Sequence, residues 1–351
     1  MESEEFLLVR DLLRSFAARY RVGSADEAKP AGRTAAQDAL DALGLGGLRR
    51  TAPPAATVQE CALLAEEHGA HPLTTSLLGT VLLAPELIRL TGAAAEATAS
   101  APRARRGHPT SARGAPGASA GGSPADPGGT PTVALAPDLR FPGVAPSELV
   151  AWDSSGADGA LCVDAEGTVT RAGLGAPAPT ADLLRGVRTA HPGPVVGRLT
   201  PDGLRRWQAY ALVIVSSELV GAARAFTALS VDYARERRQY GRPIGSFQAV
   251  RHLLADATVL VEAGTSAVRY AAWCLDHEPA DRALTAARVA KAEVNSSAVE
   301  AVYTGMQVFG GIAQTWEHVA HLYLRRVLLG ANVLATTADL LPALAEGEAA
   351  A

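Results

Sequence analysis

Cysteine is scarce in this sequence. The three cysteines, Cys61, Cys162 and Cys274, are odd in number and far apart. This spacing excludes both a disulfide framework and a zinc-binding cluster. It is typical of small core residues in a reducing compartment.

Neither sign of charge is in excess, and no apolar run is long. The 36 acidic and 32 basic residues give a net charge of −4, which indicates neither a nucleic-acid partner nor an acidic tail. The longest apolar run, Ala209 to Ser216, is far shorter than the ~20 residues of a membrane span. Charged residues interrupt residues 1–20, unlike a secretory signal. We therefore expect a cytoplasmic protein without a membrane span.

Aromatic residues are also few, at 5%, whereas 48% of the residues are hydrophobic and alanine is abundant. This apolar fraction is typical of a folded chain, and alanine favours closely packed helices. At ~150 residues per domain, the 351 residues predict two or three domains. The expected fold class is mostly α with a small β domain.

Composition divides the chain into four parts. Residues 1–97 have apolar residues at helical spacing and predict an N-terminal helical domain. Residues 98–131 are rich in Ala, Gly, Pro, Ser and Arg and lack large apolar side chains, which predicts a disordered linker. Residues 132–198 hold short apolar runs between turns and predict a small β-rich middle domain. Its expected strands cover residues 132–135, 149–152, 159–163 and 167–171.

Long helical patterns fill residues 199–345. Thr200 and Pro201 give an N-cap and a proline at the first helical position. Helices joined by short loops pack as a four-helix bundle, which is the fold we expect here. The four expected helices cover residues 202–238, 246–276, 280–308 and 317–341, the last ended by Pro342.

Three motifs in this region are more specific than the helical pattern. The first covers residues 233–250 (YARERRQYGRPIGSFQAV), the second is AKAE at residues 290–293, and the third runs from QVFGGI at residues 307–312 to residue 326. In this order and spacing, they resemble the C-terminal domain of the acyl-CoA dehydrogenase family. The resemblance implies an N-terminal helical domain, a middle β-barrel, here reduced, and a C-terminal four-helix bundle.

The resemblance also implies an FAD site that is shared between subunits. Glycine allows a pyrophosphate or a ring to approach the backbone, and arginine offers a fork of donors to phosphate. Glutamine amides suit ribose or adenine edges. The residues that match FAD-contacting positions of the family are Arg237, Gln239, Tyr240, Gln248, Gln307, Gly310 and Gly311.

Each of these features alone also fits a purely structural role. Arg237 would then lie at a solvated helix end, Gly310 and Gly311 would end a helix, and Tyr240 would be a core aromatic. Glu317, His318 and His321 likewise do not follow the His-Glu-x-x-His order of zinc proteases. In the family, this stretch resembles a packing and subunit-contact signature. We therefore predict no metal site.

The family reaction is α,β-dehydrogenation of an acyl thioester, and it needs a carboxylate base. The two positions that carry this base in the family fall at Leu334 and Ala211, which cannot accept a proton. The nearest carboxylate on the first bundle helix is Glu218, in an apolar stretch where burial would raise its pKa. Glu218 is therefore our candidate catalytic residue. The alternative is a structural glutamate that pairs with an arginine from a neighbouring helix or faces a subunit contact.

The middle domain lacks the Thr-Glu-Pro and Gly-Ser-Asp stretches that hold the flavin in the family. The resemblance therefore implies a divergent subunit that completes the FAD site of an acyl-CoA dehydrogenase paralogue. The alternatives are a self-sufficient homo-oligomeric FAD enzyme with an unconventional base, and a catalytically inactive structural or assembly protein. Expected partners are an acyl-CoA or a carrier-protein acyl thioester and, as electron acceptor, an electron-transfer flavoprotein.

Overall fold

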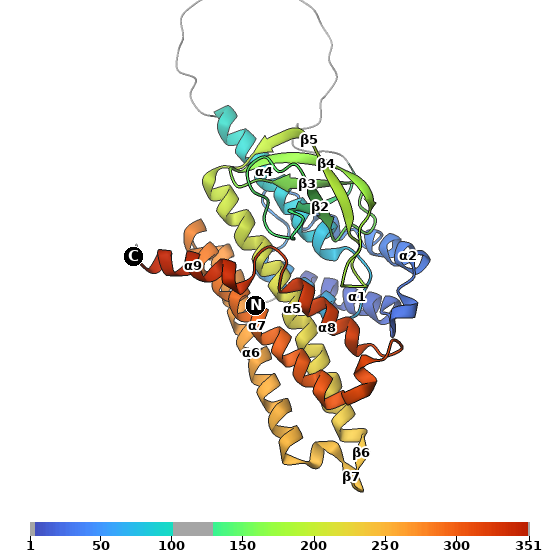
Figure 1. The fold of residues 1–351 in the computed structure, drawn as a ribbon. Coiled ribbons are helices and arrows are strands. Elements are labelled where there is room, and N and C mark those ends of the chain that lie inside the picture. The colour runs from blue at the N-terminus through green and yellow to red at the C-terminus, as the bar shows by residue number, and fades with distance from the viewer. Residues whose placement is uncertain (1–3, 101–128, 350–351) are drawn as a thin grey trace, which may run out of the picture.

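The computed structural model describes residues 4–100 and 129–349 (Figure 1). Residues 101–128, most of the predicted linker, lie outside the described residues. Helices precede this gap, and a five-stranded barrel and long helices follow it. The barrel lies at one end of the long helices, beside the N-terminal helices (Figure 1).

The N-terminal helices are short and closely packed. α1 spans Glu4–Tyr20, α2 Pro30–Asp41, α3 Val58–Gly69 and α4 Ala84–Ser100, and a π-helical segment at Leu77–Leu83 leads into α4. A capping box of Thr57 and Glu60 begins α3. Pro85 lies in the first turn of α4, where a missing N–H is tolerated. The change from π- to α-helix therefore lies next to this proline.

Five strands form a closed barrel in the order β1-β2-β5-β4-β3. They span Pro131–Leu135, Leu149–Trp152, Gly159–Val163, Thr168–Pro177 and Arg188–Arg198. The sequence prediction missed β5, because Pro192 and Pro194 argue against a strand. Register shifts in the β4–β5 pairing, including one between Thr170 and Ala172, accommodate this irregular strand.

Small side chains fill the barrel interior, as its narrow lumen requires. The buried cluster there consists of Ala134, Leu149, Ala151, Ala160, Cys162, Ala172 and Ala190. On the outer face, larger residues such as Val133, Trp152 and Leu161 join the main core with the helices. The barrel is thereby attached to the rest of the molecule by its apolar outer face.

The C-terminal helices are α5 Pro201–Glu236, α6 Gln248–His277, α7 Ala280–Phe309, α8 Ala320–Gly330 and α9 Thr337–Ala349. The first four pack against one another as a bundle. Within the described residues, α5 is the helix long and apolar enough to cross a membrane, but 78% of that apolar stretch is buried. Its apolar residues are therefore accounted for as core.

The single helix expected over residues 317–341 is wrong. The chain breaks between α8 and α9, and Pro342 lies inside α9 instead of ending a helix. At the break, Leu334 is buried with φ of 70°, and its N–H donates to the Leu139 carbonyl at 2.8 Å. Phe141 N–H donates back to the Leu334 carbonyl at 3.3 Å. Pairing with the β1–β2 connection thus replaces the helical hydrogen bonds.

Helices α3 and α5 cross with their backbones in contact. A Cβ atom added at Gly69 would overlap the Glu218 carbonyl, and one at Gly221 would overlap the Glu66 carbonyl. Glycine at both positions therefore permits the crossing. The crossing brings His68 beside Glu218, at the centre of the molecule.

Candidate functional site

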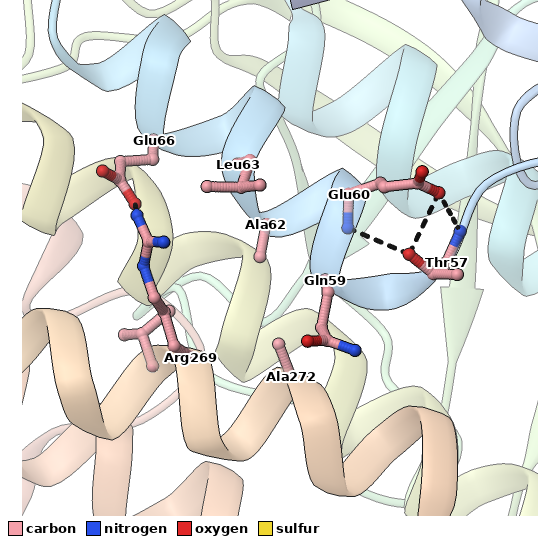
Figure 2. A pocket seen from close by; sticks show the side chains of 9 residues that line it. Thr57, Gln59, Glu60, Ala62, Leu63, Glu66, Arg269 and Ala272 are labelled. Atoms are coloured by element: carbon pink, nitrogen blue, oxygen red, sulfur yellow. Dashed lines mark hydrogen bonds and ion pairs between the residues drawn. The ribbon is translucent and has the colours of Figure 1, made fainter. Parts of the chain in front are cut away.

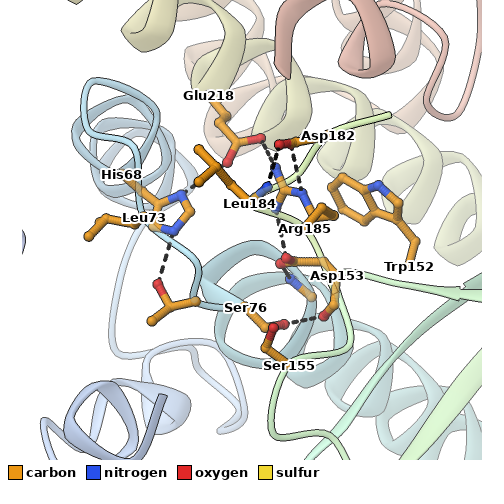
Figure 3. A network of polar contacts seen from close by, with 12 residues as sticks. His68, Leu73, Ser76, Trp152, Asp153, Ser155, Asp182, Leu184, Arg185 and Glu218 are labelled. Atoms are coloured by element: carbon orange, nitrogen blue, oxygen red, sulfur yellow. Dashed lines mark hydrogen bonds and ion pairs between the residues drawn. The ribbon is translucent and has the colours of Figure 1, made fainter. Parts of the chain in front are cut away.

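A buried network of charged side chains joins the N-terminal helices, the barrel domain and the bundle (Figure 3). Arg185, between β4 and β5, donates to Asp153 Oδ1 at 2.7 Å and to Glu218 Oε2 at 2.5 Å. Its guanidinium lies over the ring of Trp152, 4.6 Å from the centroid. Asp153 also accepts a hydrogen bond from Gly79 N–H at 2.7 Å. A single arginine therefore links α5 to the barrel and to the helix that precedes α4.

Arg326 of α8 is the second cation of this network. Its Nη1 lies 3.9 Å from Glu218 Oε1, and its Nε lies 3.4 Å from Asp182 Oδ2. It also donates to the carbonyls of His71 and Leu73. Arg326 is 2% exposed and Glu218 1% exposed. Paired and hydrogen-bonded charges of this kind are tolerated in a core, whereas isolated ones are not.

His68 completes the surroundings of Glu218. Its Nδ1 lies 3.0 Å from Glu218 Oε1, and its Nε2 lies 3.2 Å from Thr75 Oγ1. Burial lowers the pKa of His68. The two contacts fit a neutral imidazole that donates from Nδ1 and accepts at Nε2.

The pKa of Glu218 is lowered, not raised as the sequence interpretation expected. Burial by itself raises it, but Arg185, Arg326 and His68 together outweigh burial. A carboxylate held in its ionised form by two guanidinium groups is a poor proton acceptor. The alternative prediction, a pair with an arginine from a neighbouring helix, agrees with the contact of Arg326 of α8, whereas the closer arginine, Arg185, lies in the β4–β5 connection.

All seven residues predicted to contact FAD are exposed and lie at one end of the bundle. This end is formed by the last turn of α5, the first turn of α6 and the last turn of α7, held together by a small cluster that includes Ala234, Leu254 and Val308. The seven residues are Arg237, Gln239, Tyr240, Gln248, Gln307, Gly310 and Gly311. Neither glycine has an atom within 4 Å of the place that a Cβ would take, so the backbone there is open to a ligand.

A tight hairpin presents Tyr240 at this end. The strands β6 Arg238–Gln239 and β7 Arg242–Pro243 are joined by Tyr240 and Gly241, both with positive φ, 52° and 77°. Positive φ at both central residues is typical of a hairpin turn that matches the strand twist. The Tyr240 side chain is 93% exposed. The turn therefore displays a flat ring that the fold itself does not bury.

The barrel and this end of the bundle are far apart within one chain (Figure 1). α5 begins next to β5 and ends at the hairpin after 36 residues, which is about 54 Å of helix. A single dinucleotide cannot extend from one end to the other. The residues at the bundle end therefore cannot act together with their own barrel.

The two predicted base positions lie elsewhere, at a cleft between α5, α7 and α9. Leu334 lines this cleft, which has a volume of about 310 Å³, and Ala211 is buried next to the lining residue Leu212. The acid among the described lining residues is Asp339. It pairs with Arg140 at 2.7 Å and accepts from Thr336 N–H at 2.8 Å, and these contacts lower its pKa. Asp339 thus serves as a helix cap, not as a base.

The histidines near Trp316 are used in packing. The Trp316 ring stacks on His321 with centroids 5.5 Å apart, and its Nε1–H donates to Asp26 at 3.1 Å. His318 lies against Phe309. These contacts connect the start of α8 with the N-terminal domain and with α7.

A second cavity, about 250 Å³, lies between α3 and α6 (Figure 2). Polar side chains that line this cavity form hydrogen bonds or ion pairs with one another. Thr57 and Glu60 form the capping box of α3, and Arg269 pairs with Glu66 at 3.3 Å. These groups are therefore occupied, the first two in capping α3 and the second two in joining α3 to α6.

Sequence reasoning identified Glu218 and the bundle-end residues, but it missed Arg185, Asp153 and Asp182 as members of the network. The one available signal was the pair Asp182 and Arg185, charges of opposite sign three residues apart in an otherwise apolar segment. The contact of Arg185 with Glu218 depends on how the barrel docks on α5, which no local pattern contains.

Comparisons with known proteins agree with this geometry. Residues 212–332 match the family model for the acyl-CoA dehydrogenase C-terminal domain. The acyl-CoA dehydrogenase IpdE2 of Mycobacterium tuberculosis is 40% identical over 131 residues, which are 37% of this chain and 39% of that protein. The match therefore spans less than half the length of that relative.

Solved structures match over nearly the whole chain. The steroid ACAD Tcur3481-Tcur3483, as its G363A variant, has a TM-score of 0.75 at 21% identity, covering 99% of both chains. The ChsE4-ChsE5 complex from Mycobacterium tuberculosis has a TM-score of 0.72 at 18% identity, covering 100% of this chain and 99% of that one. At these identities the likeness shows that the fold is shared.

Proposed function

We propose that this chain, whose residues 212–332 match the acyl-CoA dehydrogenase C-terminal domain, is a divergent subunit of an FAD-linked enzyme that dehydrogenates an acyl thioester between its α and β carbons. In this proposal, its bundle end completes the FAD site of a paralogous partner subunit. The substrate is an acyl-CoA or a carrier-protein acyl thioester that the partner binds, and an electron-transfer flavoprotein is the electron acceptor.

The observation that carries the proposal is the placement of the seven cofactor residues. They are exposed together at the bundle end, remote from their own barrel. Hydrogen-bond donors and accessible glycines on an exposed surface, which the barrel of the same chain does not cover, suit a cofactor that is bound mainly by another chain. The names of two structural relatives, Tcur3481-Tcur3483 and ChsE4-ChsE5, pair two gene products, which supports a heteromer.

Each residue at the bundle end has a role in this proposal. Arg237 neutralises phosphate charge, the amides of Gln239 and Gln307 bind ribose or adenine, and Tyr240 stacks on a ring. Gly310 and Gly311 let the cofactor approach the backbone. FAD, when bound, would accept a hydride from the β carbon of the substrate.

The missing base also supports a partner-dependent role. Leu334 and Ala211 cannot accept a proton, Asp339 caps a helix, and Glu218 is ion-paired in the core. Proton abstraction at the α carbon is therefore assigned to the partner subunit.

Co-expression with a candidate paralogue tests the proposal. We expect Arg237→Ala to lower the flavin content of the purified complex at least fivefold, because a charged hydrogen bond to phosphate contributes about 1.5–3 kcal/mol. Arg235→Ala is the matched control, since Arg235 is an exposed arginine of the same helix that pairs with Asp232. The control should leave flavin content unchanged.

Two outcomes would contradict the proposal. If Arg237→Ala and Gly310→Leu leave flavin content and turnover unchanged, the bundle end has no cofactor role and the chain is an assembly protein. If the chain purified alone oxidises an acyl thioester and Glu218→Gln abolishes that turnover while leaving the chain folded, the chain is a self-sufficient enzyme.

A further inference from the structure

The cleft between α5, α7 and α9 has an unusual balance of charge. Arg140, Arg288 and Asp339 line it, and Arg140 is neutralised by Asp339 at 2.7 Å. Arg288 makes no hydrogen bond or ion pair within the described parts of the chain. Burial lowers its pKa, and no neighbouring acid opposes this. The cleft therefore carries one uncompensated positive charge.

The remaining walls combine one polar group with apolar side chains. Gln208 of α5 lines the cleft and, like Arg288, has no hydrogen bond to the described residues. Leu212, Leu284 and Leu340 form a largely buried apolar surface beside these two donors. A volume of about 310 Å³ is at the lower end of small-molecule sites.

We propose that this cleft binds an organic monocarboxylate with an apolar chain. The carboxylate accepts hydrogen bonds from Arg288 and Gln208, and the chain packs against the leucines. A single negative charge matches the single excess positive charge, whereas a dianionic phosphate would exceed it and would find no second free cation among the described lining residues. The proposal goes beyond the proposed function, because it needs neither FAD nor a partner subunit.

The cleft lies at the break between α8 and α9. Leu334, at one of the two positions where the family carries its base, lies in the wall of the cleft, and Ala335 follows it. The segment 332–335 joins α8 to α9, and Arg140 bonds both the Asn332 carbonyl at 2.6 Å and Asp339. A bound carboxylate would therefore lie against this break and against α9.

Isothermal titration calorimetry of the full chain with octanoate, without added flavin, tests the proposal. We expect one saturable site, and we expect octanamide, of equal length but neutral, to bind at least about tenfold more weakly. Arg288→Gln should weaken octanoate binding about tenfold or more, since it removes a charged hydrogen bond. The matched control Arg282→Gln, an exposed arginine of the same helix, should change it by less than about twofold.

A second variant acts through volume instead of charge. Ala343→Trp places a large ring on a half-buried residue at the edge of the cleft and should block octanoate while leaving the helical circular dichroism unchanged. No saturable octanoate binding below about 10 mM would overturn the proposal. Equal binding by Arg288→Gln and the native chain, or tighter binding of inorganic phosphate than of octanoate, would also overturn it.

Discussion

Glu218 illustrates how the surroundings of one side chain determine its chemistry. An isolated carboxyl in an apolar helix would be a base with a raised pKa. Arg185, 2.5 Å from this carboxylate, together with Arg326 and His68 reverses the direction of the pKa shift. The same residue type in the same apolar stretch thus changes from a candidate base to a structural ion.

Glu218→Gln should destabilise the protein by about 3–5 kcal/mol at pH 7, because it leaves Arg185 and Arg326 buried without their shared counter-ion. The folded pKa of Glu218 lies below its unfolded value of about 4.3, so its stabilisation is present above about pH 5 and is lost as pH falls. Urea unfolding should therefore show the difference between variant and native protein shrinking below pH 4.

Glu166→Gln is the control for this measurement. Glu166 and Arg198 form an exposed pair at 3.4 Å, so the change should cost less than about 1 kcal/mol. A similar small effect for Glu218→Gln would show that the buried network is not needed for folding.

Lys291 is a second buried ionisable residue, and it has no acidic partner among the residues that the structure describes. It is 0% exposed and donates to Asn295 Oδ1 at 2.5 Å and to the Gly330 carbonyl at 2.8 Å. Burial, with Arg140 nearby, lowers its pKa to about 7. Two acceptors match the two N–H bonds of a neutral amine.

The stability of the protein should consequently rise with pH above 7. Between about pH 7 and pH 10 the unfolded lysine binds more protons than the folded one, so raising the pH favours folding. In urea unfolding, the free energy of unfolding of the native protein, relative to that of Lys291→Met, should rise by on the order of 2 kcal/mol between pH 7 and pH 9. Lys29→Met, at an exposed lysine, should show no such pH-dependent difference. A flat difference for Lys291→Met would mean that Lys291 stays charged in the folded state.

Among the helices and strands, close approach of backbones fixes the arrangement more than helix propensity does. Gly→Ala in a helix ordinarily stabilises by about 1 kcal/mol. At Gly221, however, a Cβ would overlap the Glu66 carbonyl of α3. The contact between the two helices therefore opposes the local preference of the residue.

Gly221→Ala should thus lower the free energy of unfolding by about 1–3 kcal/mol or more. Gly32→Ala in α2 is the matched control, because its added Cβ would meet only ordinary contact, 3.8 Å from the Glu27 carbonyl, and should stabilise by about 0.5–1 kcal/mol. Thermal or urea unfolding measures both. Stabilisation by Gly221→Ala would show that α3 and α5 can separate without cost.

For the whole molecule, the barrel and the seven predicted cofactor residues lie at opposite ends of a long helix. α5 connects them over 36 residues. In the proposed heteromer, the partner subunit brings its barrel to this bundle end.

The chain purified alone should therefore show no visible flavin absorption while giving a helical circular dichroism spectrum. The absorption should appear when the chain is co-purified with its paralogous partner. Stoichiometric flavin in the chain alone, resistant to gel filtration, would mean that copies of this chain complete the site for one another.

The sequence by itself determined the elements with strong local signals. The capping box at Thr57, the stop at Gly310 and the long apolar pattern of α5 are set by residues near in the chain, and the bundle motifs carried the resemblance to the acyl-CoA dehydrogenase C-terminal domain that the family model matches over residues 212–332. The placement of the seven candidate cofactor residues at one exposed end also follows from helix ends that short loops bring together. How they act there stays a prediction.

Only the tertiary structure determined the ion pairs of Glu218, the helix break at Leu334 and the formation of strand β5. Each depends on partners distant in sequence: Arg185 and Arg326 for the carboxylate, Leu139 and Phe141 for the break, and β2 and β4 for a strand that carries two prolines. Long-range electrostatics and backbone pairing outweighed local propensity at these points, because burial strengthens a charge interaction and requires every backbone group to find a partner.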